Sequence, residues 1–318
     1  MLWLLLSLLV LLLVGALWEW RAGRAFSRRH RPPGRMVALG DGRALHLLCE
    51  GEDGPTIVVE QGLGEPSLLW RPIQGEAQSF SCFCLYDRPG SLWSPPVAGS
   101  RSVEARAGDL HALLHGAGLP GPYILAAHSY GGLVARAFAA RYPREMAGLV
   151  MVDAIEESIA FHPDYQRFLR RARPFVALLR AAAAVGLIRL FANLFGGRVK
   201  DEADAAMRAA TARPAFYRSI ADELASLRGP ARNFGSLGDL PLIVITHGKP
   251  FPGPFAALEP FWRPGQERLA ARSSRGELWV AENSNHMIAA DEPALVIAAL
   301  RRVAEMAAAG PESSAAAG

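Results

Sequence analysis

The sequence predicts an α/β fold in which helices cover a mostly parallel, eight-stranded sheet, with a helical cap inserted after the sixth strand. From about residue 36, short β-branched or apolar runs alternate with helical runs, the pattern of parallel strands joined by crossover helices. Residues 155–235 interrupt this alternation, because they are helical in composition and carry no strand pattern. The 318 residues, 51% of them hydrophobic, are ample for a large core.

The chain opens with an apolar segment that we interpret as a transmembrane helix over residues 1–20. Residues 1–18 contain no charged side chain, and with Glu19 and Trp20 they approach the roughly 20 residues that cross a bilayer. The alternative is a cleaved signal peptide, but its charged start, shorter apolar core and small-residue cleavage site are not evident.

A basic juxtamembrane linker is expected over residues 21–35, which carry six arginines and no acid. The positive-inside rule then places the body of the protein in the cytoplasm. A periplasmic or extracellular body is the alternative for a chain with a single span.

The predicted core comprises residues 36–154 and 236–308. It begins with a hairpin, MVALG and ALHLLCEG, because the Asp-Gly pair between these runs is a strong turn signal. The strands TIVVEQG and CFCLYD, a helix over residues 103–117 and the strand YILAAHS follow. GLVMVDA, LPLIVITHG and GELWVAEN complete the sheet, and PALVIAALRRVAEMAA is the closing helix. Residues 309–318 are expected to form a disordered tail.

The inserted segment, residues 155–235, is the predicted cap. Its residues 165–200 hold seven arginines and one lysine with no acid, a local charge of +8, interleaved with apolar side chains. Two interpretations stay open: a basic amphipathic surface that lies on a membrane or over the functional site, or ordinary helices packed on the core.

Charge and cysteine content exclude several classes of protein. The net charge is +4, but six arginines and one glutamate give residues 1–35 a charge of +5, which leaves −1 for the rest. We therefore expect no nucleic-acid partner. The three cysteines lack the spacing of a metal site, so neither a metal nor a cofactor is predicted.

The most informative motif is AAHSYGG, residues 126–132, between a strand-like and a helix-like run. A serine held on a tight strand-to-helix turn needs small residues two positions before and after it, and Ala127 and Gly131 meet this need. Ser129 is therefore the predicted nucleophile. The backbone N–H of Tyr130, at the start of the next helix, is placed to face a developing oxyanion.

A serine nucleophile also needs a base and a second oxyanion donor. His286 follows the last strand, and in an open α/β sheet that loop lies at the same carboxyl edge as the serine turn. His286 is therefore the predicted general base, with His247 as its main competitor. The turn EQGLGEPS offers the N–H of Leu63 as the second donor, unless it is an ordinary glycine-rich turn.

Residues 34–308 resemble the α/β-hydrolase fold family, and in particular a bacterial group of serine hydrolases and esterases with an HSYGG elbow. The stretches that carry the resemblance are AAHSYGGLVARAFAARYPREMAGLVMVDA, NSNHMIAADEP and LYDRPGSLWS, where Asp87 and Arg88 are expected to organise the turn after a strand. The resemblance implies the strand order 1-2-4-3-5-6-7-8 and a cap after strand 6. That order makes the strands LHLLC and CFCLY neighbours, so Cys49 is expected to face Cys84, or Cys82. The two would form a disulfide in an exported domain and remain thiols in the cytoplasm.

The resemblance also implies an acid that orients the base. Many members place an aspartate after strand 7, but that loop here reads THGKPFPGPFAALEP and has none. Asp153, at the end of strand 6, is our predicted acid, as in relatives where it lies one strand earlier. The alternatives are Glu157 and Glu259, and Asp153 would then be a structural acid that holds the cap.

Together these residues predict a serine hydrolase that cleaves a lipophilic carboxylic ester through an acyl-enzyme. The expected partners are a small-molecule or lipid-like ester and a membrane, contacted through the N-terminal helix and the basic cap. The alternatives are an acyltransferase, lactonase or haloperoxidase with the same triad, and a catalytically inactive binding module that has kept the fold.

Overall fold

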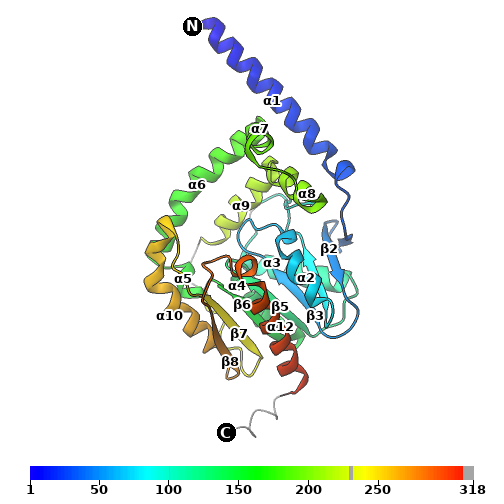
Figure 1. The fold of residues 1–318 in the computed structure, drawn as a ribbon, viewed down its shortest axis with the longest axis vertical. Coiled ribbons are helices and arrows are strands. Elements are labelled where there is room, and N and C mark those ends of the chain that lie inside the picture. The colour runs from blue at the N-terminus through cyan, green and yellow to red at the C-terminus, as the bar shows by residue number, and fades with distance from the viewer. Residues whose placement is uncertain (100, 229–231, 311–318) are drawn as a thin grey trace.

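At the centre of the computed structural model, which describes residues 1–99, 101–228 and 232–310, is an eight-stranded sheet (Figure 1). Its order is β1-β2-β4-β3-β5-β6-β7-β8, antiparallel from β1 to β2 and from β2 to β4 and parallel in every later pair. The predicted fold class and strand order are thereby confirmed. The strands are β1 (Arg35–Ala38), β2 (Ala44–Glu50), β3 (Thr56–Glu60), β4 (Cys82–Tyr86), β5 (Tyr123–His128), β6 (Met146–Val152), β7 (Leu242–His247) and β8 (Gly276–Ala281).

Helices cover both faces of the sheet, because the central strands are apolar on both sides. Val58 of β3 belongs to one buried cluster with α3 (Val103–Gly116), α4 (Gly131–Arg141) and α10 (Glu259–Ala270). Its neighbours Ile57 and Val59 belong to a second cluster with α2 (Arg71–Ala77) and α12 (Pro293–Ala308). Short helices join these elements: η1 (Ser67–Trp70), η2 (Pro143–Glu145), η3 (Gly253–Leu258) and α11 (Ile288–Asp291).

The connection from β6 to β7 forms a layer of helices above the core (Figure 1). Its helices are α5 (Glu157–Ala160), α6 (Pro163–Ala184), α7 (Leu187–Phe195), α8 (Glu202–Thr211) and α9 (Pro214–Ser226). The chain bends by 84° between α6 and α7, at Gly186, whose φ of +74° favours glycine.

The N-terminal helix α1 (Leu2–Arg29) projects from the body (Figure 1). Its most apolar 18-residue window has a mean hydropathy of 2.3, long and apolar enough to cross a membrane. The helix does not end at residue 20, and residues 21–29, which we expected in a linker, continue it. Alanine and arginine favour helices, and the first prolines stand only at 32 and 33.

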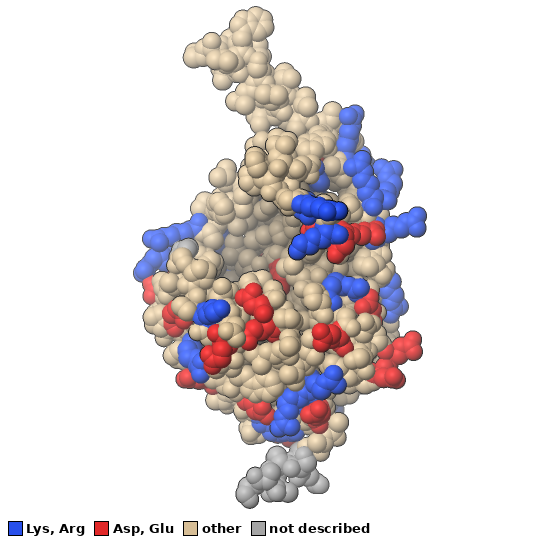
Figure 2. All heavy atoms as spheres, viewed as in Figure 1, with Lys and Arg blue, Asp and Glu red and all other residues tan. Residues whose placement is uncertain are grey.

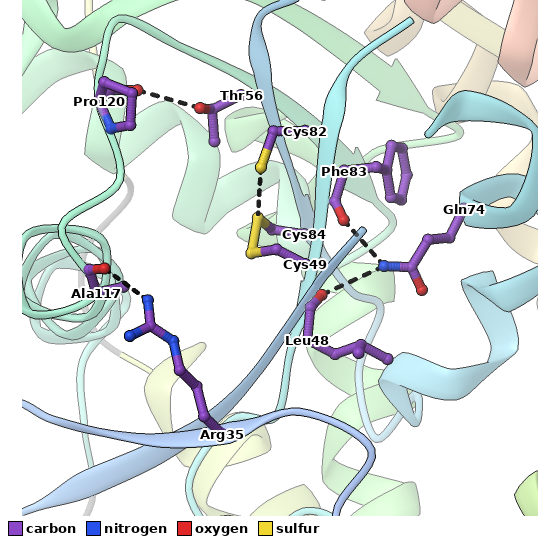
Figure 3. Close-up of a disulfide and its surroundings, with 10 residues drawn as sticks. All are labelled: Arg35, Leu48, Cys49, Thr56, Gln74, Cys82, Phe83, Cys84, Ala117 and Pro120. Carbon is purple, nitrogen blue, oxygen red and sulfur yellow. Dashed lines mark hydrogen bonds between the residues drawn. A yellow bond between two sulfur atoms is a disulfide. The ribbon is translucent and has the colours of Figure 1, made fainter. Parts of the chain in front are cut away.

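Cys49 and Cys84 face each other across β2 and β4 and form a disulfide (Figure 3). Cys82, on the same face of β4, stays a free thiol with its Sγ 3.9 Å from that of Cys84. Beside them, Gln74 of α2 donates to the carbonyls of Leu48 and Phe83, which ties the helix to both strands. At the other end of the chain, the expected tail from 309 lies outside the described residues from position 311 on.

Candidate active site

Ser129 lies on the turn between β5 and α4, in a conformation that few residues other than glycine adopt. Its φ is +51°, a backbone state that costs about 1–3 kcal/mol and is found mainly at functional sites. Gly131 makes the turn possible, because a Cβ there would lie 2.1 Å from the carbonyl oxygen of Glu60. The sequence therefore builds a sharp elbow that presents the serine at the carboxyl edge of the sheet.

The structure brings Ser129, His286 and Asp153 into one hydrogen-bonded chain. The distance from Ser129 Oγ to His286 Nε2 is 2.9 Å, and from His286 Nδ1 to Asp153 Oδ2 it is 2.7 Å. In this chain the hydroxyl donates to Nε2, and the Nδ1–H of the imidazole donates to the carboxylate. Such an arrangement can move a proton from the serine to the histidine while a buried carboxylate stabilises the imidazolium.

Asp153, directly after β6, is held from several sides. Its Oδ1 accepts hydrogen bonds from Trp262 Nε1 at 2.7 Å and from the backbone N–H of His247 at 3.2 Å. Burial raises the pKa of Asp153, but hydrogen bonds from His247 and His286 outweigh this and lower it to about 2. The carboxylate is therefore ionised across the physiological range. Like Ser129, Asp153 has a positive φ, +44°.

His247, the competing base, contacts the same carboxylate oxygen of Asp153 as His286 does. Its Nδ1 is 2.8 Å from Asp153 Oδ2, and its Nε2 is 3.1 Å from Glu259 Oε1. Burial lowers the pKa of His247, but Asp153 and Glu259 outweigh it and raise the pKa above its ordinary value. Both ring nitrogens are thus engaged by carboxylates, and among the described residues neither contacts Ser129.

The two alternative acids lie elsewhere. Glu157, the first residue of α5, pairs with Arg136 of α4 at 3.0 Å. Glu259 contacts His247 and accepts from the N–H of Phe251. Within the described ranges neither carboxylate contacts His286, so Asp153 alone of the three acids has the position that the resemblance implies.

The two predicted oxyanion donors are Tyr130, the residue after the serine, and Leu63. Leu63 lines the same cavity as Ser129, in a turn fixed by Glu65, which accepts from the N–H of Gly62 and contacts His128 Nδ1. Neither the Leu63 nor the Tyr130 N–H donates to another group in the part of the chain that the structure describes. Both donors are therefore available to a ligand oxygen.

His128 and burial together set the basicity of His286. The charge of Glu65 outweighs burial and raises the pKa of His128, whose Nε2 lies 3.0 Å from the carbonyl oxygen of His286. Burial, with His128 as a nearby charge, lowers the pKa of His286 below its ordinary value despite the hydrogen bond with Asp153. His286 is therefore neutral, the form that accepts a proton, around neutral pH.

Arg88 joins the Leu63 turn to the cap. This buried guanidinium lies between Glu60, at 2.9 Å, and Glu223 of α9, at 3.0 Å, and also donates to the carbonyl of Gly62. Glu223 in turn accepts from the N–H of Gly64 at 2.8 Å. Sequence patterns placed Arg88 in a turn but missed Glu223, because nothing local marks a partner so distant in the chain.

A cavity of about 420 Å³ opens above Ser129 and His286, between the core and the cap, and Figure 2 shows the molecule hollowed there. Its walls are mostly apolar. They include Phe168 and Leu169 of α6, Ile220 and Leu224 of α9, and Phe251 and Trp262. This cavity suits an apolar ligand with one polar group at the serine.

Outside the cavity, His111, His115 and Glu145 form a group of residues of types that can bind metals. The carboxylate of Glu145 lies 3.0 Å from His111 Nε2 and 3.2 Å from His115 Nε2.

Comparison with known proteins agrees with this fold. Residues 57–299 match the model of the Alpha/beta hydrolase family, and the chain belongs to that family. An esterase from Thermogutta terrifontis has a similar structure, with a TM-score of 0.64 and 20% identity over 86% of this chain and 98% of the esterase.

Two curated relatives show how far the sequence similarity extends. An uncharacterized protein of Schizosaccharomyces pombe is 27% identical over 303 residues, 83% of this chain and 54% of the relative. The pimeloyl-[acyl-carrier protein] methyl ester esterase of a Shewanella species is 34% identical over 108 residues, 34% of this chain and 38% of the relative. The chain thus spans about half or less of the length of these relatives.

Proposed function

We propose that this chain is a serine hydrolase that cleaves a lipophilic carboxylic ester through an acyl-enzyme. The observation that carries the proposal is the hydrogen-bonded chain of Ser129, His286 and Asp153 at the floor of an apolar cavity. The backbone strain at Ser129 and Asp153 supports it, because strain of this kind persists where function requires it.

In the proposed mechanism, Ser129 Oγ attacks the ester carbonyl carbon while its proton passes to His286 Nε2. The carbonyl oxygen gains the negative charge and accepts from the N–H groups of Leu63 and Tyr130. His286 then gives the proton to the departing alcohol, which leaves an acyl-serine. Water attacks that acyl group with His286 as base again, and the acid product leaves with Ser129 restored.

The lipophilic substrate is inferred from the cavity and from α1. Apolar walls exclude water and favour an acyl chain or an apolar alcohol over a charged ligand. The methyl ester esterase among the relatives acts on an ester by its name, which agrees with the proposed bond type. We further infer that α1 anchors the chain in a membrane, where such esters concentrate.

Two features bear on which side of the membrane the body of the protein lies, and they favour opposite sides. The arginines after the apolar segment favour a cytoplasmic body. The Cys49–Cys84 disulfide favours an oxidising compartment outside the cytoplasm. The rule for arginines is weakest for a single span, whereas a disulfide persists only in an oxidising compartment, and we therefore propose that the body is exported.

The test combines a fluorophosphonate probe with a chain-length series of p-nitrophenyl esters. We expect the wild type to be labelled and to prefer acyl chains longer than acetyl. Ser129→Ala should abolish labelling and lower kcat about 10⁶-fold. Asp153→Asn should lower kcat about 10⁴-fold, because the histidine then adopts the wrong tautomer.

The exposed serine of α5 provides a matched control, because Ser158→Ala leaves the site untouched and should keep full activity. Folded wild-type protein that takes no label would overturn the proposal in favour of the binding module. Undiminished activity of Asp153→Asn would overturn the assignment of the acid alone. Transfer of the acyl group to an added alcohol in preference to water would identify an acyltransferase.

A further inference from the structure

Helix α7 is amphipathic, but its apolar side faces outward. Leu187, Leu190, Phe191, Leu194 and Phe195 recur at helical spacing and lie on one side of the helix, with 45–69% of each side chain exposed. No residue of α7 is buried. Phe175 and Leu178 near the end of α6 are 60% and 65% exposed and add to this surface, which we call the α7 face. An apolar surface of this kind marks an interaction site.

The polar side of α7 faces the protein and holds α1. Arg189 forms two hydrogen bonds with Glu19, at 2.6 and 2.9 Å, and the Glu19 side chain is only 3% exposed. A buried, two-pronged pair between an arginine and a carboxylate fixes orientation as well as distance. The pair therefore sets how α7 lies against α1.

Backbone contacts bring the two elements still closer. A Cβ on Gly15 of α1 would lie 2.2 Å from the carbonyl oxygen of Val185, so only glycine fits there. A Cβ on Gly186 would lie 3.0 Å from both the Gly15 carbonyl oxygen and the Trp18 ring. The α6–α7 turn is thus seated directly on residues 15–19 of α1.

These contacts fix the depth of α7 relative to a membrane. Residues 15–19 are the end of the apolar segment, and Arg21 and Arg24 follow them. At 1.5 Å per residue, an element packed on residues 15–19 lies within roughly 8 Å of the end of the apolar segment. If α1 spans the bilayer, α7 must lie where the hydrocarbon meets the headgroups.

We propose that the α7 face inserts into the interfacial layer of the bilayer that α1 spans, so that the cap rests on the membrane. This rests on α1 being an anchor, as inferred above. Figure 2 shows uncharged atoms over the free part of α1 and the top of the cap, with basic side chains beside them. Arginines at the end of the apolar segment, such as Arg21 and Arg24, are placed to pair with lipid phosphates.

The α7 face also relates the membrane to the cavity. Helix α6 carries Phe175 and Leu178 on its exposed side, whereas Leu169 and Val176 of the same helix line the cavity. One helix therefore separates the bilayer surface from the apolar space above Ser129. This deepens the proposed function, because the substrate class becomes an ester that resides in the membrane.

Depth-dependent fluorescence quenching tests the docking without reference to activity. In a Cys82→Ser background with the disulfide kept oxidised, single cysteines at Ser7, Phe191 and Ser79 are labelled with an environment-sensitive dye. The protein is placed in phosphatidylcholine and phosphatidylglycerol vesicles that contain nitroxide lipids. Ser7 reports on the anchor, Phe191 on the α7 face, and Ser79, exposed after α2, is the control.

We expect quenching of Ser7→Cys by nitroxides deep in the bilayer, of Phe191→Cys by nitroxides near the headgroups, and none of Ser79→Cys. Quenching at position 7 without quenching at 191 would overturn the docking and leave the anchor intact. No quenching at position 7 would show that α1 does not span the bilayer and would overturn the docking with it. Contact of Phe191 with a second copy of the chain, seen as self-quenching without lipid quenching, would also overturn it.

Activity gives an independent readout if the proposed hydrolase holds. Phe191→Asp with Leu194→Asp should lower hydrolysis of a vesicle-embedded ester about tenfold, because interfacial binding scales with buried apolar area. Hydrolysis of p-nitrophenyl acetate in solution should not change, since neither residue lines the cavity. Met36→Asp, on the exposed edge strand β1, is the matched control and should change neither rate. An equal fall in both rates for the double variant would contradict the docking. A wild-type protein that hydrolyses neither ester would contradict the proposed hydrolase but not the docking.

Discussion

Asp153 is the residue that organises the site, because two histidines share its carboxylate. His286 Nδ1 and His247 Nδ1 lie 2.7 and 2.8 Å from the same oxygen, Oδ2. One histidine extends the chain to Ser129, while the other extends it to Glu259. The charge on His247 therefore acts on the same carboxylate that orients the proposed base.

The pH dependence of activity should reflect the lowered pKa of His286. Burial lowers this pKa below 6.5, so the neutral, proton-accepting form persists into mildly acidic solution. We expect kcat/KM to rise with pH and to reach half its maximum below pH 6.5. Initial rates with a soluble ester across the acidic range would measure it, and a midpoint above 7.5 would contradict the assignment of His286.

His247→Gln should raise that midpoint. Both ring nitrogens of His247 face carboxylates, and only the protonated imidazole can donate to both. Its positive charge weakens the effect of Asp153 on His286, and glutamine keeps a donor but removes the charge. We expect the midpoint to rise by roughly half to one pH unit with the fold intact. An unchanged midpoint in folded protein would show that His247 is neutral.

At the scale of elements, the link that matters most is between the Leu63 turn and α9. Arg88 forms ion pairs with both Glu60 and Glu223, and all three side chains are buried. Since Glu223 also accepts from the N–H of Gly64, a movement of α9 would carry the turn with it. The cap and the proposed oxyanion donor are therefore positioned by the same arginine.

Arg88→Met should destabilise the fold by about 3–5 kcal/mol, because it leaves the buried carboxylates of Glu60 and Glu223 without the cation that they share. Urea unfolding followed by circular dichroism would measure the change. A variant that also carries Glu60→Gln and Glu223→Gln removes the unpaired charges and should recover part of the loss. No recovery would show that Arg88 contributes through packing rather than charge.

Local sequence patterns were enough to predict each strand of the sheet. The strands are apolar runs bounded by turn residues, and the elbow is marked by small residues around Ser129. Helix α10 was not predicted, because Pro260 and Pro264 both fall within it and obscure its period. Helix α2 was missed because it is short and includes Pro72 and Gly75.

Pairings between distant segments could not be predicted in the same way. Glu19 and Arg189 are 170 positions apart, and no local pattern links them. The role of Glu223 likewise depends on a fold that brings α9 over the sheet. Asp153 was placed only because the family resemblance supplied the strand order, which puts the end of β6 beside the elbow.

At the scale of the whole molecule, the disulfide between β2 and β4 tests where the body lies. Protein isolated from its native membrane, denatured without reductant and treated with a maleimide should take up one label, on Cys82. After reduction it should take up three, one for each cysteine. Three labels before reduction would place the body in a reducing compartment.

The same bond should stabilise the fold, since it closes a loop between residues 35 positions apart. We expect Cys49→Ser with Cys84→Ser to lower the free energy of unfolding by about 2–4 kcal/mol. Cys82→Ser, a substitution on the same strand that leaves the bond intact, is the matched control.

The way α1 is seated on the body bears on how the protein is best purified. Phe26 is buried among Leu68, Trp93 and Ala206, with the guanidinium of Arg213 over its ring at 4.1 Å. A soluble version made by deleting residues 1–29 would expose the apolar residues that surround Phe26 and would leave Arg189 without its partner Glu19. Detergent extraction of the intact chain, or a cut between Val14 and Gly15 that spares Glu19 and Phe26, would keep the cap in its native shape.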